Sequence, residues 1–348
     1  MKKTTVPQRR VTSQDVAKRA GVSQTTVSFV LNDVVAAKIS EETRQRVLVA
    51  ASELGYVPNA AAQALAGHRT QIIGLGFPQS HPHLSSHLFL LQVLDGLMEV
   101  VQQHGLRLLL DSFEGTGEKE AYLNLARAKR IDGLIIIDPN LDNPALSTLV
   151  EDGFPLVLLG RIPEVNVCSV DVDNRAAARA AVAHLLSQGH TSIGCITNSP
   201  LSDMAAQERL QGYRDALEIA NLSYDEKLVR YGKFTPESGY EAMARLLDDA
   251  ARLTAVFVAA DVVAFGAMRA IQDFGLQIPE DIALVGFDDV PLARFANPPL
   301  TTIRLPAIEQ GRQAGKLLLD LILNQAEPGR QVLLETELIV RTSSVKED

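Results

Sequence analysis

Three side chains near the amino terminus could read the edges of DNA bases. Gln24, Thr25 and Phe29 would share one helical face, because positions 25 and 29 are one turn apart. A glutamine amide can pair with adenine, a threonine hydroxyl can donate or accept, and an exposed phenylalanine contacts thymine methyl groups or other apolar atoms. This face therefore predicts a recognition helix for the major groove. The flanking polar side chains suit phosphate oxygens and are Thr26, Ser28 and Asn32.

A helix-turn-helix unit would hold this face in place. Thr12 and Asp15 have the spacing of a capping box, Gly21 suits a tight turn, and Ser23 can cap the helix that follows. The predicted helices cover 13–19, 24–31 and a segment that begins after Ser40. Apolar residues recur at helical spacing through all three and would form one small core: Val16, Ala17, Val22, Val27, Val30, Leu31, Val47, Ala50 and Leu54.

The charge distribution supports a polyanionic partner for this segment. The whole chain carries a formal charge of −9. Residues 1–70, however, hold ten Lys/Arg against five Asp/Glu and carry +5, whereas the remaining residues carry −14. A basic segment on an acidic body is typical of a nucleic-acid-binding domain attached to a globular core. The alternative, a helical module with a merely polar face, does not predict this asymmetry.

A short alanine-rich segment follows the three helices. Pro58 would end the third helix, Asn59 could cap a new one, and Gly67 would stop it after about two turns. A helix that short is below the ~12–15 residues needed for marginal stability alone. Leu65 is its single large apolar side chain, and two such helices in a minor groove could insert their leucines between base pairs. The alternative is a flexible linker.

The rest of the chain predicts an α/β fold. Apolar runs alternate with amphipathic stretches of helical length, which implies parallel sheets covered by helices on both faces. The runs are 72–77, 106–110, 133–138, 155–160, 192–197, 255–259 and 282–287. The helices lie around 89–103, 118–129, 174–187, 204–219, 236–249, 262–274 and 307–323. Ligands bind beyond the carboxyl ends of such strands, where Asp261 and Asp288 follow two of the runs. Each of these aspartates could instead be a helix or turn cap.

The order of these motifs resembles the LacI/GalR family of bacterial transcriptional regulators. The resemblance is carried by DVAKRAGVSQTTVSFVLN and YVPNAAAQALAG and extends along essentially the whole chain. It implies an all-α helix-turn-helix headpiece followed by a two-lobed core of the type I periplasmic-binding-protein fold. The expected domains are a headpiece over 10–57, a hinge over 58–69 and a core over 70–348. The expected lobes are an N-lobe over about 70–161 and 296–326 and a C-lobe over about 167–292 and 329–342.

The resemblance assigns the base-reading positions to Gln24, Thr25 and Phe29 and the minor-groove lever to Leu65. Phe29 is a departure, because many members carry a polar or basic residue there, often Arg, so no operator sequence can be transferred. The complete set of expected DNA contacts is Ser13, Gln14, Ser23, Gln24, Thr25, Thr26, Ser28, Phe29, Asn32, Asn59, Ala62, Leu65 and Ala66.

The resemblance also implies an effector site between the lobes. Arg209, Asp288 and Asp261 match effector-binding positions, and an Arg/Asp pair suits a hydroxyl-rich ligand. Phe89 aligns with a pocket-lining position, although core packing is an equal alternative. Ala260 and Gly160 depart from the residues that sugar-binding members often carry. A sugar is therefore the first expectation for the effector, and a purine or nucleoside is the alternative.

Three histidines lie within seven residues after the first predicted strand. His81, His83 and His87 could bind a metal ion, because a neutral imidazole is a common ligand. No Cys or carboxylate accompanies them nearby. We therefore favour a polar lip of the effector cleft, with His87 as an effector contact, and expect neither a metal site nor a cofactor.

Other classes of protein find little support. The chain lacks the G-x-S-x-G, P-loop and H-E-x-x-H motifs, so we expect no enzyme. Cys168 and Cys195 form no C-x-x-C pair and are expected to be buried free thiols. The first residues contain no apolar segment of a leader peptide, and no run approaches the ~20 apolar residues of a membrane span. We expect a cytoplasmic protein associated with the nucleoid.

The expected mechanism joins these parts. A homodimer would bind a pseudo-palindromic operator, and an effector would change the angle between the lobes and so order or disorder the hinge helices. We expect a repressor that an inducer releases from the operator rather than one that needs a corepressor. Activation of transcription at some promoters is a further alternative. Two rival functions are an architectural DNA binder, which predicts no ligand response, and an enzyme with a fused DNA-binding head, which predicts turnover.

Overall fold

The computed structural model describes residues 11–32, 37–57, 69–78, 87–113, 118–139, 144–162, 165–249 and 253–345. The chain divides into two compact units, residues 1–71 and residues 72–348. Each unit has its own buried apolar core, as the sequence patterns predict. Across the described residues, every helix is too short or too polar to span a lipid bilayer.

The first unit is the predicted helix-turn-helix. Its helices are α1 (Ser13–Ala20), α2 (Gln24–Leu31) and α3 (Glu41–Leu54). The capping box at the start of α1 is complete, because the Thr12 amide donates to the Asp15 carboxylate (2.9 Å) and the Thr12 hydroxyl accepts from the Asp15 amide. Gly21 has a φ of 68°, which permits the tight turn between α1 and α2. Val16, Val27 and Val47 are fully buried where the three helices meet.

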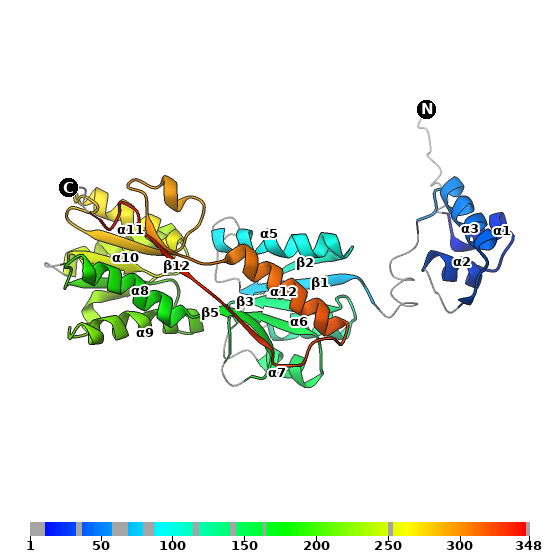
Figure 1. Ribbon diagram of the computed structural model, residues 1–348, viewed down its shortest axis with the longest axis horizontal. Coiled ribbons are helices and arrows are strands. Elements are labelled where there is room, and N and C mark those ends of the chain that lie inside the picture. Colours follow the sequence, from blue (N-terminus) through cyan, green and yellow to red (C-terminus); the bar gives the residue numbers. More distant parts are fainter. Residues whose placement is uncertain are drawn as a thin grey trace, which may run out of the picture. The chain divides into compact units, whose positions relative to one another are not determined.

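The first sheet of the core has the strand order β11-β5-β4-β3-β1-β2, and all its pairings are parallel. Its strands are β1 (Ile72–Pro78), β2 (Arg107–Phe113), β3 (Gly133–Ile137), β4 (Leu156–Leu159), β5 (Cys168–Val172) and β11 (Gln331–Leu334). One face is covered by α5 (Leu88–Gln103) and α12 (Ala307–Ile322), which lie side by side (Figure 1). The other face is covered by α6 (Glu118–Arg127) and α7 (Pro144–Glu151).

Strand β3 shows why the strands of this lobe appear in the sequence as runs of apolar residues. Ile135 and Ile137 pack in the cluster with α5 and α12, whereas Leu134 and Ile136 pack in the cluster with α6 and α7. Alternate side chains point to opposite faces of a strand, and both faces are covered, so every position of β3 is buried.

The second sheet has the strand order β12-β10-β9-β8-β6-β7. Its strands are β6 (Ile193–Thr197), β7 (Val229–Tyr231), β8 (Ala255–Val258), β9 (Ala283–Asp288), β10 (Thr301–Arg304) and β12 (Glu337–Ile339). All pairings are parallel except that between β10 and β12. Helices α8 (Asn174–Ser187) and α9 (Met204–Ile219) cover one face, and α10 (Pro236–Asp249) and α11 (Asp261–Asp273) cover the other.

The expected lobe boundaries are wrong at three strands. Strand β5 pairs with β4 and β11 pairs with β5, so both belong to the first sheet rather than to the C-lobe. Strand β10 pairs with β9 and belongs to the second sheet rather than to the N-lobe. Polar residues interrupt β5 (CSVDV) and β10 (TTIR), so neither forms the apolar run that marks the other strands. The chain therefore crosses between lobes after β5, after β10 and between β11 and β12.

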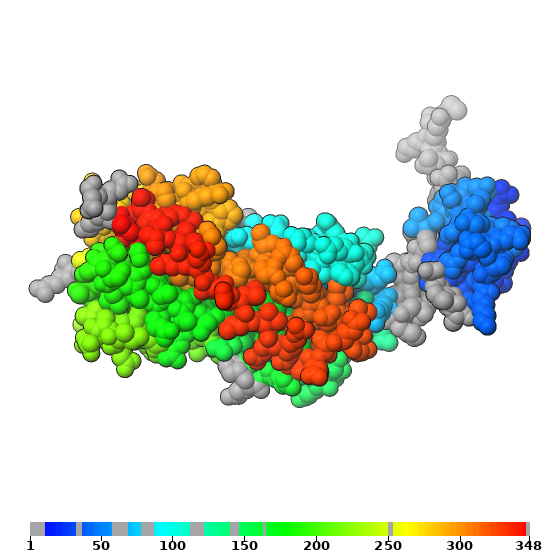
Figure 2. Space-filling view, in the orientation of Figure 1, coloured from blue at the N-terminus to red at the C-terminus, as the bar shows by residue number. Residues whose placement is uncertain are grey.

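The carboxyl-terminal segment links the two lobes. It runs over the surface of the core from β11 in the first sheet to β12 in the second (Figure 2, red). The Asp289 carboxylate, just after β9, forms ion pairs with Arg304 of β10 (2.8 Å) and with Arg341 of the carboxyl-terminal segment (2.7 Å). The second pair fixes this segment to the second lobe. Cys168 and Cys195 are buried and free, as predicted.

Candidate nucleic-acid interface and ligand cleft

The side chains predicted to read bases share one exposed face of α2. Gln24 and Thr25 are exposed, and Phe29 is 38% exposed although it is large and apolar. The opposite face of α2 holds Val27 and Val30, which are buried against α1 and α3. An aromatic ring is thus exposed on the face of α2 that neither α1 nor α3 covers. That these three residues contact bases stays a prediction.

The polar neighbours of this face are held by local hydrogen bonds. The Gln24 amide Nε2 donates to the Ser13 hydroxyl (2.7 Å), which orients the glutamine relative to α1. The Ser23 hydroxyl accepts from the Thr26 amide (3.1 Å) and so caps α2, as predicted. The Asn32 amide donates to the Ser28 hydroxyl (3.2 Å) at the end of α2.

The other expected DNA contacts divide into two groups. Gln14 is exposed on α1, one residue after the hydrogen-bonding partner of Gln24. The expected hinge contacts lie outside the described residues and are Asn59, Ala62, Leu65 and Ala66. Their roles stay predictions.

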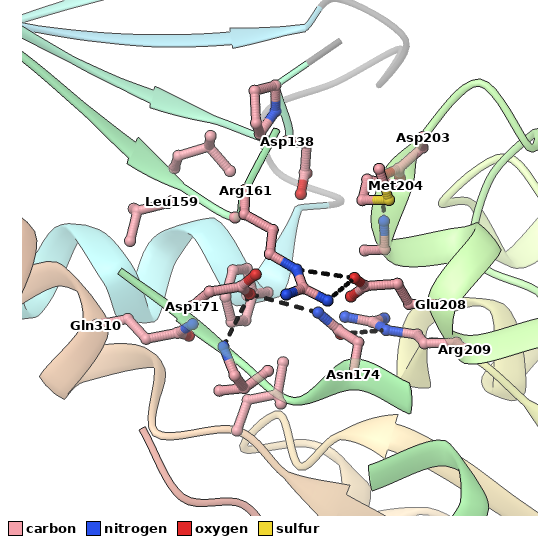
Figure 3. Close-up of a pocket in the computed structure, with 17 residues that line it drawn as sticks. Asp138, Leu159, Arg161, Asp171, Asn174, Asp203, Met204, Glu208, Arg209 and Gln310 are labelled. Carbon is pink, nitrogen blue, oxygen red and sulfur yellow. Dashed lines mark hydrogen bonds and ion pairs between the residues drawn. The ribbon is translucent and has the colours of Figure 1, made fainter. Parts of the chain in front are cut away.

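Two adjoining cavities lie between the sheets of the core, at the carboxyl ends of their strands. Both have Phe89, Asp138 and Arg209 on their walls. We call them cavity A, which contains Asp171 and Gln310 (Figure 3), and cavity B, which contains His87 and Asp288. Phe89 packs against the cores of both lobes.

Arg209 is the most tightly held cation of the cleft. It lies on α9, where its Nε donates to Asn174 Oδ1 (2.9 Å) and its Nη1 donates to the carbonyl of Ala259 (2.7 Å). Its guanidinium plane lies 4.0 Å from the ring centroid of Phe287, and its Nη1 is 3.8 Å from Asp288 Oδ1. The group is therefore oriented before any ligand arrives, which lowers the entropic cost of binding.

Asp288 ends β9 in a strained backbone conformation, with a φ of 120°. Burial raises the pKa of its carboxyl group to about 7, although the nearby Arg209 and His87 oppose that rise. The structure thus brings Arg209, Asp288, His87 and Phe89 together at the cleft, where the sequence expected an effector.

Asp261 differs from the expectation, because it is not on the wall of either cavity. It is fully buried at the start of α11, and its Oδ1 accepts from the Thr302 hydroxyl (2.7 Å). Its Oδ2 accepts from the Val290 amide (2.9 Å), in the loop that follows β9. Both oxygens are occupied, so Asp261 ties that loop to β10 and acts behind the site rather than within it.

His87 has a second role that its position in a histidine cluster did not reveal. Its Nδ1 accepts from the Leu90 amide (3.2 Å) and caps α5, while its ring stacks on Phe234 of the other lobe at 5.8 Å. His87 Nε2 lies 3.8 Å from Asp138 Oδ2. His81 and His83 lie outside the described residues, and within the described ones no group of side chains has the makeup of a metal site.

Further polar residues complete the cleft and escaped the sequence reasoning. They are Asp138, Arg161, Asp171, Asn174, Asn198, Asp203, Glu208 and Gln310. Asp138 follows β3, so the rule for carboxyl ends of strands could have found it. Asp171 lies within β5 and Gln310 within α12, where nothing in the local sequence marks them.

One ion pair joins the lobes at the rim of cavity A (Figure 3). Arg161 follows β4 in the first lobe, and its Nε donates to Glu208 Oε1 on α9 of the second lobe (2.9 Å). Two carboxyl groups lie deeper. Burial raises the pKa of Asp171 to about 7, and burial together with repulsion from Asp138 raises the pKa of Asp203 to about 6. The cleft is thus acidic, buried and bridged across its rim.

Comparisons with known proteins cover both compact units of the chain. Residues 12–59 match the family described as bacterial regulatory proteins of the lacI family, and residues 182–344 match a periplasmic binding protein-like domain. The HTH-type transcriptional regulator CelR of Thermobifida fusca is 38% identical over 96% of this chain and 98% of its own length. The HTH-type transcriptional repressor PurR of Salmonella typhi is 35% identical over 95% of this chain and 96% of its own length.

Two solved structures extend the likeness. The complex of the transcriptional regulator CelR with cellobiose has a TM-score of 0.75 at 36% identity, covering 96% of this chain and all of that one. The lac repressor dimer bound to operator and an anti-inducer has a TM-score of 0.85 at 32% identity, covering 97% of this chain and all of that one.

Proposed function

This chain belongs to the LacI family of bacterial regulatory proteins, and from that premise we propose that it is a transcriptional repressor controlled by a sugar. It binds double-stranded operator DNA through the helix-turn-helix, as a homodimer, and it is not an enzyme. The sugar binds between the lobes of the core and changes the affinity for the operator. We further propose that the protein acts in the cytoplasm, on the nucleoid.

The observation that carries this function is the buried polar cleft between the two lobes. Arg209 is oriented by two hydrogen bonds and stacked on Phe287, and Asp288 lies beside it. Preorganised polar groups with an aromatic wall suit a hydroxyl-rich ligand of small size. A sugar is also the ligand named for the similar CelR structure, which contains cellobiose.

Coupling between the two sites passes through the segment that joins them in sequence. We propose a headpiece over 10–57, a hinge over 58–69 that forms helices only on DNA, and an effector-binding core over 70–348. An isolated helix of this length is marginal in water, so a bias of about 1–3 kcal/mol from the core would suffice to order or disorder it. Release of the operator on sugar binding is the direction that we propose.

The test combines operator selection with a ligand screen. The full chain would first be used to select its operator from random DNA, and its affinity would then be measured by fluorescence anisotropy. A thermal-shift screen of mono- and disaccharides, sugar phosphates and purines would name the ligand. We expect a disaccharide such as cellobiose to raise the melting temperature and to weaken operator binding. A purine that does so instead, or an operator affinity that no compound changes, would contradict the proposal.

A further inference from the structure

Acidic groups dominate the walls of cavities A and B. Among the described residues that line them, five carboxyl groups stand against two guanidinium groups. The acids are Asp138, Asp171, Asp203, Glu208 and Asp288, and the cations are Arg161 and Arg209. At pH 7.5, above the raised pKa values of Asp171, Asp203 and Asp288, more than half of each of these carboxyl groups is ionised, so negative charge is in excess in the cleft.

Both cations already have a carboxylate at hand. Arg161 donates to Glu208 across the rim, so their charges offset one another. Arg209 lies 3.8 Å from Asp288, and two of its five N–H donors are used on Asn174 and on the Ala259 carbonyl. An incoming anion would have to compete with a carboxylate for either guanidinium group.

The neighbouring parts of the sequence supply no further cation. Four segments of the first lobe lie outside the described residues, namely 79–86, 114–117, 140–143 and 163–164, and none of them contains a lysine or an arginine. The first includes His81 and His83, and histidine has an ordinary pKa near 6.5. The acidic balance thus holds whatever position these segments take.

Two buried acceptors line the cleft without a donor. Asn198 Oδ1 in cavity B and Gln310 Oε1 in cavity A have no hydrogen-bond partner, and their residues are 0% and 4% exposed. Gln310 comes from α12 of the first lobe and Asn198 from the loop after β6 of the second. A buried acceptor without a donor is costly, so a ligand that brings hydroxyl donors to both ends of the cleft is favoured.

From these observations we infer that the cleft takes an uncharged, hydroxyl-rich sugar that extends past Phe89 from cavity A into cavity B, and that it rejects phosphorylated and acidic sugars. This inference rests on the proposed function and narrows its ligand class. Sugar hydroxyls can donate to the carboxylates and to both amide oxygens. A phosphate group brings about −1.5 to −2 charges into a wall that is already acidic.

Asp138 is the specificity-determining residue in this scheme. It is the acid that lines both cavities, and it lies close to His87 and to the acidic cluster. Its repulsion already contributes to the raised pKa of Asp203, after burial, and it also acts on Asp288. A ligand phosphate would add a further negative charge to the same group of carboxylates.

The test compares matched ligands on the full-length protein. Isothermal titration calorimetry at pH 7.5 would measure cellobiose against cellobiose 6′-phosphate, and glucose against glucose 6-phosphate. We expect the neutral member of each pair to bind at least about tenfold more tightly, because like charges brought together at a buried site cost several kcal/mol.

Asp138→Asn tests the assigned residue. Asp138 has a φ of 48°, a conformation that asparagine accepts readily, so the fold should tolerate this change. The ratio of the two dissociation constants should fall by a factor of several in the variant. Glu218→Gln removes the same charge from an exposed position near the end of α9 and should leave the ratio unchanged.

Two outcomes would overturn the inference, and they are distinguishable. If the phosphorylated sugar binds as tightly as the neutral one or more tightly, the charge selection is wrong while the proposed sugar-controlled repressor stands. If no sugar of either kind binds while operator binding is intact, the proposed sugar effector fails and the inference fails with it.

Discussion

At the scale of single residues, the properties of Arg209 depend on what surrounds it. Its hydrogen bonds to Asn174 and to the Ala259 carbonyl, together with Phe287, fix one orientation of the guanidinium group. Replacement by alanine would remove that anchor and leave Asp288 without its compensating charge. The same residue therefore serves both the electrostatics and the shape of the cleft.

We expect Arg209→Ala to weaken sugar binding by about tenfold or more and to abolish the sugar response of operator binding, because hydrogen bonds to a charged group are each worth about 1.5–3 kcal/mol. Binding to operator should persist, since the headpiece is a separate compact unit. Calorimetry and anisotropy would measure the two affinities. Arg269→Ala, a change at a surface ion pair, is the control, and a normal sugar response in Arg209→Ala would remove this residue from the site.

A second residue-scale prediction concerns pH. Burial holds the pKa of Asp203 at about 6 in the folded protein, whereas the ordinary value is 3.8. The folded state thus binds more protons than the unfolded chain between these values, and its stability falls as the pH rises through that window. We expect the melting temperature of Asp203→Asn to depend less on pH between 4 and 6 than that of the wild type. Glu218→Gln should keep the wild-type slope, and equal slopes in all three proteins would contradict the burial of Asp203.

At the scale of elements, a hydrogen bond joins α1 and α2 beside the face that we predict to contact DNA. The Gln24 side chain, which we predict to contact a base, is exposed and donates a hydrogen bond of 2.7 Å to the Ser13 hydroxyl of α1. Recognition by α2 therefore depends on how α1 is packed against it.

We expect Gln24→Ala to weaken binding to the selected operator by about tenfold or more, because a bidentate base contact is worth about 1–3 kcal/mol of discrimination. Ser13→Ala should have a smaller effect in the same direction, because it only releases the glutamine. Anisotropy with the operator and with a scrambled duplex would measure both variants. An equal loss on the two duplexes would show that Gln24 contacts the backbone instead.

The hinge is the other element that we propose to join DNA binding to effector binding. Leu65 lies outside the described residues, and its role as a minor-groove lever is a prediction from the sequence. We expect Leu65→Ala to weaken operator binding by about tenfold or more while sugar affinity stays nearly intact, because unstacking a base step costs a few kcal/mol that the leucine must offset. Unchanged operator affinity in this variant would exclude the lever.

At the scale of the whole molecule, two contacts join the lobes of the core at the cleft in addition to the packing of Phe89. One is the rim pair of Arg161 and Glu208, in which the arginine side chain is 52% exposed. The other is the stack of His87 on Phe234, whose rings lie 5.8 Å apart at an interplanar angle of 18°. The first is screened by solvent and the second is largely shielded from it.

The two contacts should differ in strength. Exposed ion pairs are worth about 0.2–1 kcal/mol, whereas an aromatic pair adds about 0.5–1.5 kcal/mol to the burial of its rings. We expect Phe234→Ala to raise the dissociation constant of the sugar more than Arg161→Gln does. Calorimetry on both variants and on the double variant would measure each contribution. A larger effect from Arg161→Gln would mean that the rim pair, not the stack, closes the cleft.

Much of the fold of this protein follows from interactions between residues that are close in the sequence. The three headpiece helices, their caps and the exposed face of α2 were predicted because each depends on residues within about one or two turns of one another. The fully apolar strands of both sheets were predicted for a similar reason, since burial on both faces leaves a continuous signal. Arg209 and Asp288 were also placed at the cleft in advance, through the resemblance and the rule for strand ends.

Tertiary structure alone decided the rest. Only hydrogen-bonded pairing shows that β5, β10 and β11 belong to sheets other than those expected, because the sequence of a strand does not tell which sheet it joins. Only the folded structure shows that Asp261 accepts hydrogen bonds from Thr302 and Val290, and that Arg161 forms an ion pair with Glu208 of the opposite lobe. The excess of acidic side chains in the cleft arises because residues far apart in the sequence line the same cavities. A sequence determines which charges a chain carries, but the folded arrangement determines which of them share a low-dielectric space, where they act on one another most strongly.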